Sequence, residues 1–397
     1  MIAIGAAMPV TASAAEIGIA SFNLAWAGTA ADFERHAAVC SVPDVNWCDS
    51  RAKIAKGETQ PSLEEQERAS RCQAAIDTAS GGPAQSLLVA PCNAYKLSAR
   101  KFSAGGLALY DDKLDGLRET IERLIDDHGV DVIAFQEVRS VEAIQTILGG
   151  HAARFDTCVA AHTAFQTVGF AWRKTVTATP GQCSDIPSLA IKEKPADPTS
   201  LRMLRPGLEL RVTIAGKPVT FMNVHLKSAC ANLVTGGGFA GRELTDPDAA
   251  CQVLNRQVAP LEDWIEKVES AAARFVLLGD FNRRLDQEAH RRVPHNQVRQ
   301  NGTPPASPNR LGPDGNVSSR FLWQEISDGK PSLFQIALAP AVTGCTGFVG
   351  LDHILISRAV RDRQSEPLSS LKVPVVRKPR QVIQTSDHCP RVTTLVF

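Results

Sequence analysis

The sequence lacks several features that would place it in a class at once. No run of about 18 or more apolar residues follows the first ten residues, so no segment is predicted to span a membrane. The 43 basic and 42 acidic residues nearly cancel, so no global field recruits a polyanion, and any attraction for phosphate must be local. No repeat with a period of about 20 to 50 residues is visible, which argues against a solenoid.

Zinc-type cysteine spacing is also missing, because none of the ten cysteines forms a Cys-x-x-Cys pair. An even number of cysteines without such motifs favours disulfides formed in an oxidising compartment, and buried free thiols in a cytosolic protein are the alternative. Spacing alone does not decide which cysteines pair. We predict sequential pairing of Cys40 with Cys48, Cys72 with Cys92, Cys158 with Cys183, Cys230 with Cys251, and Cys345 with Cys389.

Positive charge is missing from the N-terminus, where the first basic residue is Arg35. Residues 1–10 are nevertheless almost all apolar or small, and Ala12-Ser13-Ala14 before Ala15 has the form of a signal-peptide cleavage site. A working signal begins with positive charge, so this interpretation places the initiator upstream; a plain apolar N-terminus is the alternative. We predict a signal peptide over residues 1–15 and a secreted or periplasmic protein.

Strand and helix patterns alternate along the rest of the chain, which predicts one α/β domain over residues 16–397. Residues 29–103 differ, since they are polar, alanine-rich and hold four cysteines; we predict a disulfide-stapled insertion, partly helical over 61–79. A hairpin over 208–226 should turn at Gly216-Lys217. Other predicted strands are 16–24, 131–139, 167–174, 275–280, 351–356 and 392–397, and predicted helices are 114–125, 141–148 and 248–272, the last kinked or divided by Pro260.

A candidate site follows the apolar run of residues 275–278, which predicts a buried strand. Gly279-Asp280-Phe281-Asn282 comes next, and on a strand that continued past Gly279 the side chains of Asp280 and Asn282 would point to the same face. An acid and an amide at the rim of a buried strand suit a metal or phosphate site. An ordinary strand-to-turn signal is the alternative.

Other polar residues stand at the ends of predicted strands or in a tight turn. Each has a plain structural explanation, because a single histidine is most often a core or surface group and a single aspartate at a strand end is usually a cap. Their joint occurrence is much harder to explain by chance. The set comprises Asn23, Glu137, His225, Asp280, Asn282, Asp352, Asp387 and His388.

Six short motifs then follow a known order: Phe22-Asn23, Gln136-Glu137, Val224-His225, Gly279-Asp280-Phe281-Asn282, Leu351-Asp352-His353-Ile354 and Ser386-Asp387-His388. Over residues 16–397, with the insertion outside, the chain resembles the endonuclease/exonuclease/phosphatase family, the superfamily of deoxyribonuclease I. The resemblance implies a four-layer α-β-β-α sandwich with two central β-sheets packed face to face. It also implies hydrolysis of a phosphate ester with a divalent metal, Mg²⁺ or else Mn²⁺ or Ca²⁺. A hard cation held by oxygen ligands neutralises the charge that develops on phosphate.

The resemblance also implies roles for these residues. The metal ligands would be Asn23, Glu137 and Asp387. Asp280 would orient or deprotonate the attacking water, and Asn282 would donate a hydrogen bond to a phosphate oxygen.

Acid and base work would fall to the two histidines, since an imidazole titrates near neutral pH. His388 fits the general base, with Asp352 fixing its tautomer. His225 fits the general acid or a cation that stabilises the phosphate.

Two flanking segments refine the subgroup. Val224-His225-Leu226-Lys227-Ser228 is similar to the deoxyribonuclease I, sphingomyelinase and inositol-phosphatase branches, whereas abasic-site endonucleases usually carry Tyr-x-Pro-Asn there. Gln136-Glu137-Val138-Arg139 resembles the deoxyribonuclease I segment whose arginine contacts nucleic acid. Arg139 and Lys227 are therefore candidate substrate contacts, with solvated surface residues as the alternative. His353 departs from the family pattern and should face away from Asp352.

The leading hypothesis is a secreted, metal-dependent nuclease that cleaves DNA, RNA or both, acting as a monomer without an obligate protein partner. Arginine-rich stretches at 283–320 and 358–380 support it if they contact the phosphate backbone, although they could equally be solvated loops. A second hypothesis keeps the chemistry but makes the substrate a phospholipid, as in a sphingomyelinase, or a small phosphoester. A third is a catalytically silent binding module on the same fold.

Overall fold

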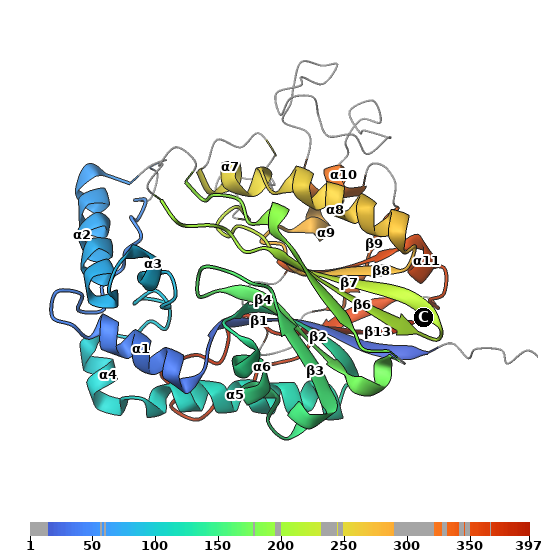
Figure 1. Ribbon diagram of the computed structural model, residues 1–397, viewed down its shortest axis with the longest axis horizontal. Coiled ribbons are helices and arrows are strands. Elements are labelled where there is room, and N and C mark those ends of the chain that lie inside the picture. Colours follow the sequence, from blue (N-terminus) through green and yellow to red (C-terminus); the bar gives the residue numbers. More distant parts are fainter. Residues whose placement is uncertain are drawn as a thin grey trace, which may run out of the picture.

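The computed structural model shows two stacked β-sheets with helices on both outer faces (Figure 1). No helix within the described ranges combines the length and hydrophobicity needed to cross a bilayer. The predicted signal segment before Ala15 and most of the basic stretch 283–320 lie outside those ranges. The described residues are 15–55, 58, 61–177, 179–194, 200–231, 244, 249–289, 321–327, 332–340, 345, 350–365 and 367–397.

The first sheet is built around the parallel pair β1 and β2, with Asn23 opposite Gln136 in the register. The carboxyl ends of two parallel strands meet at one edge, so the residues that follow them are neighbours. The order across this seven-stranded sheet is β10 (Ala337–Leu338), β12 (Ser369–Lys372), β13 (Arg391–Val396), β1 (Glu16–Ala27), β2 (Val130–Val138), β4 (Thr167–Arg173) and β3 (Phe155–Val159).

The second sheet repeats this arrangement around the parallel pair β7 and β8, in which His225 lies opposite Asp280. Antiparallel β11 then places Asp352 opposite the same Asp280. Three candidate residues are therefore adjacent through strand register alone. The order across these six strands is β5 (Gln182–Ile186), β6 (Gly207–Ile214), β7 (Lys217–His225), β8 (Phe275–Asp280), β11 (Asp352–Ser357) and β9 (Leu333–Gln335).

Three apolar layers hold the sandwich together and confirm the predicted α-β-β-α order. In β8, Val276 and Leu278 point between the sheets, while Phe275 and Leu277 point outward under α8, which explains the continuous apolar run. Figure 1 shows α5 and α6 over the first sheet and α7 and α8 over the second. The helices of the sandwich are α5 (Ala108–Asp126), α6 (Val141–Leu148), α7 (Ala249–Asn255), α8 (Val258–Ala271), α9 (Leu285–Ala289), α10 (Leu322–Ser327) and α11 (Arg358–Arg361), with 3₁₀ turns η1 (Gly149–Arg154), η2 (Lys174–Val176) and η3 (Pro187–Leu189).

Two local predictions are displaced by a few residues. The predicted helix 248–272 is divided between Asn255 and Val258, ahead of Pro260. Pro260 itself lies in the first turn of α8, where the missing N–H of proline breaks no helical hydrogen bond. The hairpin was predicted to turn at Gly216-Lys217, but it turns at Ala215-Gly216. Ala215 and Gly216 have φ of 49° and 71°, the positive values that a tight two-residue turn requires.

Residues 29–103, the predicted insertion, form helices at one end of the sandwich (Figure 1), and their core is continuous with that of the first sheet and α5. The helices of the insertion are α1 (Ala30–Cys40), α2 (Leu63–Ser80), α3 (Pro83–Ser86) and α4 (Ala99–Gly105), and its aromatic core includes Phe33, Tyr95 and Phe102.

Five disulfides are formed, and three of them confirm the predicted pairs 158–183, 230–251 and 345–389. The two pairs predicted within the insertion are wrong: Cys40 joins Cys92, and Cys48 joins Cys72 inside that loop. The Cys48–Cys72 disulfide is nested inside the loop closed by Cys40–Cys92, because after α2 the chain returns to the end of α1. The spacing of the cysteines does not reveal this tertiary contact.

A buried histidine in the insertion should make folding sensitive to acid. His36 Nδ1 donates to the carbonyl of Ala90 over 2.8 Å, and burial lowers the pKa of His36 from 6.5 to about 4. The unfolded chain takes up this proton first, so the folded state should lose about 3 kcal/mol as the pH falls from about 6.5 to about 4.

Thermal unfolding of wild type and His36→Gln across this pH range measures the effect. The variant should lose the part of the pH slope that is due to His36, whereas His128→Gln, outside this core, should keep the full slope. An unchanged slope in His36→Gln would contradict the prediction.

Candidate active site

Two distortions of the first sheet orient Asn23 and Glu137 at the same edge. The β1–β2 register shifts after Asn23, and the β2–β4 register shifts at Glu137. Glu137 has φ +57°, in the left-handed region that non-glycine residues seldom adopt. Its Oε2 accepts a hydrogen bond from the N–H of Trp26 over 3.1 Å. Such irregularities turn a side chain out of the strand pattern and are common beside active sites.

The second sheet brings His225 and Asp280 to the facing edge. Gly279 has φ +142°, and a Cβ there would lie 2.0 Å from the carbonyl oxygen of Val224, so only glycine fits between the two strands. The strand ends at Asp280, which confirms the predicted bounds 275–280. Asn282 turns back at φ +50°, and its N–H donates to Asp280 Oδ1 over 2.8 Å.

Hydrogen bonds between buried side chains join the two sheets at the site. Asn23 Nδ2 donates to Asp280 Oδ2 over 3.1 Å, across 257 positions of the chain. Below it, Gln136 Nε2 donates to Asn223 Oδ1 over 2.8 Å, and Asn223 Nδ2 donates to two main-chain carbonyls of the first sheet. A fully satisfied buried network of this kind fixes the separation of the two sheets beneath the site.

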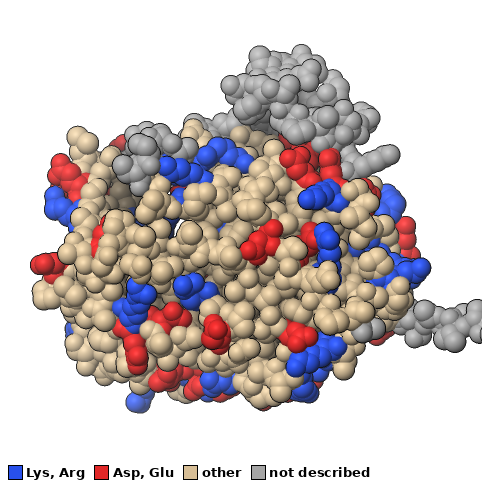
Figure 2. Space-filling view, viewed as in Figure 1, with Lys and Arg blue, Asp and Glu red and all other residues tan. Residues whose placement is uncertain are grey.

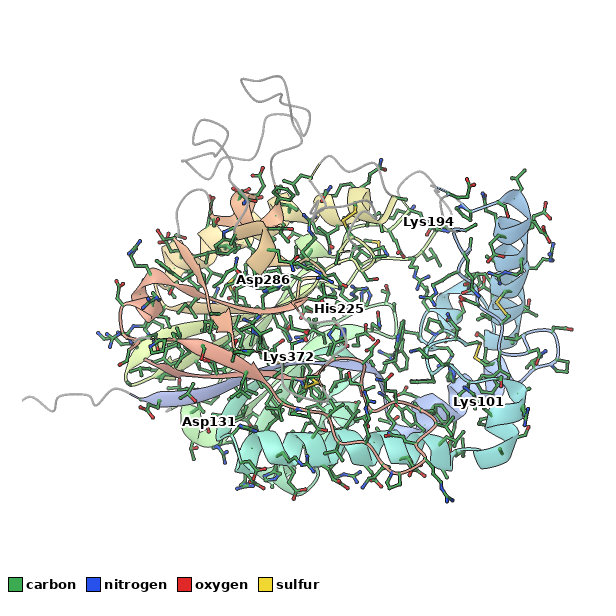
Figure 3. The ribbon with its side chains drawn as sticks, turned by 180° about the vertical axis from the view of Figure 1, so that it is seen from behind. Lys101, Asp131, Lys194, His225, Asp286 and Lys372 are labelled. Atoms are coloured by element: carbon green, nitrogen blue, oxygen red, sulfur yellow. A yellow bond between two sulfur atoms is a disulfide. The ribbon has the colours of Figure 1, made fainter. Side chains whose placement is uncertain are left out.

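His388 reaches the same place from the turn before β13. The hydroxyl of Ser386 donates to the carbonyl of Asn23 over 2.7 Å and accepts from the N–H of His388 over 3.0 Å. The turn is thereby attached to the strand that carries Asn23. The structure thus brings all eight residues of the strand-end set into one region, and Figure 3 shows His225 between the strands and the insertion.

An ion-pair chain fixes the ring of His388. Its Nδ1 lies 3.1 Å from both carboxylate oxygens of Asp352, and its Nε2 lies 3.9 Å from Asp280 Oδ2. Lys372 Nζ lies 3.3 Å from Asp352 on the other side. Burial raises the pKa of Asp352, but His388 and Lys372 outweigh it and hold that pKa well below its usual range. Burial lowers the pKa of His388, but Asp352 and Asp280 outweigh it and raise that pKa to about 10.

His225 has the opposite electrostatic environment. Burial, followed by the charges of Arg205 and His388, lowers the pKa of His225 well below its usual value, so this imidazole is neutral. Its Nε2 lies 3.6 Å from Asp280 Oδ2 and 3.8 Å from Glu137 Oε1. Burial raises the pKa of Asp280 to about 6 against the influence of His388. One charged and one neutral imidazole therefore flank the same carboxylate.

The oxygen donors of Glu137, Asn23 and Asp387 fit a divalent cation. Burial, followed by the charge of Asp387, raises the pKa of Glu137 to about 7, so a bound cation would offset the repulsion between these two carboxylates. Within the described part of the chain, Glu137 Oε1 accepts no hydrogen bond and is available as a ligand. Amide and carboxylate oxygens are the ligands that Mg²⁺, Mn²⁺ and Ca²⁺ prefer.

A different group has ligand atoms that lie within 4.8 Å of one another: Asp280, Asp352 and His388. It suits a cation less well, because Nδ1 of His388 is already directed at both carboxylate oxygens of Asp352. Lys372 supplies further positive charge to the same carboxylate.

The two predicted substrate contacts differ in their surroundings. Arg139 is half-buried next to the Glu137 segment, and no described residue forms a hydrogen bond or ion pair with its guanidinium. Lys227 Nζ instead pairs with Glu193 Oε1 at 3.3 Å. Lys372, from the second arginine-rich stretch, is buried against Asp352 rather than exposed to a substrate. Figure 2 shows basic and acidic side chains interspersed over one face.

Sequence reasoning missed two cations near the site, the half-buried Arg205 and the buried Lys113. Arg205 donates from Nε to the carbonyl of His225 over 3.3 Å and from Nη2 to that of Leu226 over 2.6 Å, and nothing in its sequence context distinguishes it. The sequence does offer a sign that Lys113 is buried, because this lysine interrupts the apolar face of α5 beside Leu114. His353 faces away from the site, as predicted, and its Nε2 lies 2.8 Å from the carbonyl oxygens of Arg283 and Gly350.

Residues 104–388 match the sequence model described as the Endonuclease/Exonuclease/phosphatase family. The chain belongs to this family. Family members are phosphoester hydrolases that use divalent metal ions, so the oxygen-rich edge described above is the expected place for phosphoester chemistry. The matched region begins just after the insertion.

Solved structures of family proteins are similar at low identity. A family protein from Bacteroides thetaiotaomicron is 13% identical, with 97% of this chain and 99% of that chain covered and a TM-score of 0.44. A mannosyl-6-phosphatase from the same organism is 12% identical (73% and 94% covered, TM-score 0.42). A 3'-5' exonuclease from Neisseria meningitidis is 15% identical (71% and 95% covered, TM-score 0.38). No curated protein matches the sequence significantly. The family assignment rests on the sequence match.

Proposed function

We propose that this family member is a secreted or periplasmic nuclease that hydrolyses phosphodiester bonds of DNA, RNA or both with Mg²⁺, Mn²⁺ or Ca²⁺. The observation that carries the proposal is the pair of imidazoles in opposite charge states around Asp280, facing the oxygen donors Asn23 and Glu137. Phosphodiester hydrolysis needs one group that accepts a proton and one that supplies positive charge or a proton.

The charge states suggest roles opposite to those first expected for the histidines. The neutral His225 is suited to accept the proton of a water that Asp280 orients, and the cationic His388 is suited to stabilise or protonate a phosphate oxygen. Asp352 keeps His388 charged and fixes its ring. Asn282 uses one amide N–H on the carbonyl of Leu226 over 3.0 Å and has a second N–H for a phosphate oxygen.

A divalent cation bound by Asn23, Glu137 and Asp387 would neutralise charge on the phosphate during hydrolysis. The chain's own contribution is to keep these oxygens fixed. The N–H of Trp26 holds the Glu137 carboxylate within the first sheet, and the hydrogen bond from Asn23 to Asp280 holds the Asn23 side chain against the second sheet.

Nucleic acid is favoured as the substrate by Arg139, a half-buried guanidinium beside the proposed cation site with no described partner. Five disulfides favour an oxidising compartment and hence export. We further propose that residues 16–397 form one catalytic domain with residues 29–103 as an insertion, and that it acts as a monomer.

The function is tested by incubating the protein with plasmid DNA, RNA, sphingomyelin and a small bis-phosphodiester, with each cation and with chelator. DNA or RNA should be cleaved only when a cation is present. Hydrolysis of sphingomyelin without cleavage of either nucleic acid would overturn the nuclease in favour of a lipid hydrolase. Binding of nucleic acid without any turnover would indicate a silent module.

Arg139→Ala should lower kcat/KM for nucleic acid about tenfold and leave the small bis-phosphodiester unaffected, because only the polymer offers a further phosphate to this arginine. Arg173→Ala is the matched control, since that arginine pairs with Asp131 at the other end of β2. Equal losses in both variants would remove Arg139 from the substrate site.

A further inference from the structure

The main chain just beyond Asn23 is held in an unfavourable conformation. Ala25 and Trp26 have φ of +50° and +66°, and two consecutive non-glycine residues in the left-handed region cost about 1–3 kcal/mol each. Such strain persists only where surrounding contacts impose it. The segment should relax if those contacts were removed.

Side chains outside the proposed catalytic set impose this conformation. The ammonium of Lys113 donates to the carbonyl of Leu24 over 2.8 Å. The hydroxyl of Tyr95 donates to the carbonyl of Trp26 over 2.8 Å. Farther along, the hydroxyl of Tyr110 accepts from the N–H of Gly28 over 2.7 Å.

Trp26 connects the insertion to the proposed cation site. Its carbonyl accepts from Tyr95, while its N–H donates to Oε2 of Glu137 over 3.1 Å. Both main-chain groups of one strained residue are therefore engaged, one by the insertion and the other by the carboxylate. If Tyr95 lost its hydroxyl, the carbonyl would lose its partner and the N–H would be free to turn away from Glu137.

Tyr95 is itself rigidly placed. It is buried, its ring lies 5.4 Å from that of Phe33 and 4.9 Å from that of His36, and Cys92, three residues earlier, is bonded to Cys40 at the end of α1. Burial raises the pKa of Tyr95, so its hydroxyl keeps the proton that it donates.

We propose that Tyr95 is a positioning residue for the divalent-cation site, through which the disulfide-stapled insertion sets the orientation of Glu137. The inference rests on the proposed function, because it requires a cation at Glu137. Groups that orient a metal ligand change metal affinity by about 10–100-fold when removed.

Titration calorimetry with Mn²⁺ and with Mg²⁺, in the absence of substrate, tests the proposal on wild type, Tyr95→Phe and Tyr110→Phe. These are the only two tyrosines of the chain, and each change removes one hydroxyl from the same aromatic core. Tyr95→Phe should bind the cation at least about tenfold more weakly. Tyr110→Phe should weaken binding far less, because its hydroxyl holds Gly28, two residues beyond the contact with Glu137, and reaches Trp26 only through Tyr95. Thermal unfolding of both variants separates loss of folding from loss of affinity.

A measurement of kcat at increasing cation concentration distinguishes weakened cation binding from general destabilisation of the fold. The activity of Tyr95→Phe should recover toward the wild-type kcat as the cation concentration is raised. Unchanged affinity in Tyr95→Phe, or equal weakening in both tyrosine variants, would overturn the proposal while leaving the cation site intact. Failure of wild type to bind either cation, or undiminished binding by Glu137→Gln, would overturn the cation site and the proposal with it.

Discussion

Replacing His388 by alanine is expected to lower kcat for plasmid DNA about 10³-fold at neutral pH, with little change in KM. His388 is the imidazole that Asp352 and Asp280 keep protonated, with a pKa raised to about 10 despite its burial. His225 cannot replace it, because burial and the nearby cations keep that ring neutral. The measurement is the initial rate of plasmid cleavage at saturating Mg²⁺.

His353→Ala provides the matched control for this experiment. His353 follows Asp352 on β11 and is equally buried, but its Nε2 lies against main-chain carbonyl oxygens away from the site. The variant should lower the melting temperature and retain kcat per folded molecule. If His388→Ala kept its rate within about fivefold of wild type, the role assigned to His388 would be wrong.

Glu137→Gln should have two opposite effects. Without a cation it should be more stable than wild type, because Glu137 and Asp387 repel each other where burial weakens solvation, as the pKa of about 7 for Glu137 indicates. With Mg²⁺ it should gain little further stability, since binding should be at least about 100-fold weaker. Glutamine keeps the shape, and its oxygen can still accept from Trp26.

Differential scanning calorimetry with and without Mg²⁺ measures both effects. Asp131→Asn is the control: this carboxylate lies near the start of the same strand, 2.7 Å from Arg173, and is labelled well apart from His225 in Figure 3. It should lower stability slightly and leave the Mg²⁺-dependent gain unchanged. A cation-free Glu137→Gln that is less stable than wild type, or one that Mg²⁺ stabilises as strongly as wild type, would contradict the assignment.

Much of the framework follows from local pattern. The helix predicted over 141–148 matches α6, and the strand predicted over 275–280 matches β8, because apolar patterns report which positions a regular element buries. The strand-end residues could be chosen for a similar reason: a polar group directly after a buried strand has to emerge at an edge of the sheet. The order of the motifs then indicated the family that the sequence match shows.

Errors occurred where the conformation of one or two residues mattered. The hairpin turns one residue early because Ala215 adopts a left-handed conformation. Alanine seldom adopts such a conformation, so the residue type did not signal it in the sequence. The nested disulfides of the insertion follow from how α1 and α2 pack, which is again invisible in the spacing.

By itself the sequence determined the apolar strands, the residue types at their ends and hence the class of chemistry. Only the tertiary structure decided how those residues act: that Asn23 bonds Asp280 across 257 positions, that His388 is charged while His225 is not, and that Tyr95 contacts the residue that holds Glu137. The physical reason is that charge state and orientation depend on burial and on neighbours distant in the chain. Local periodicity carries no information about either.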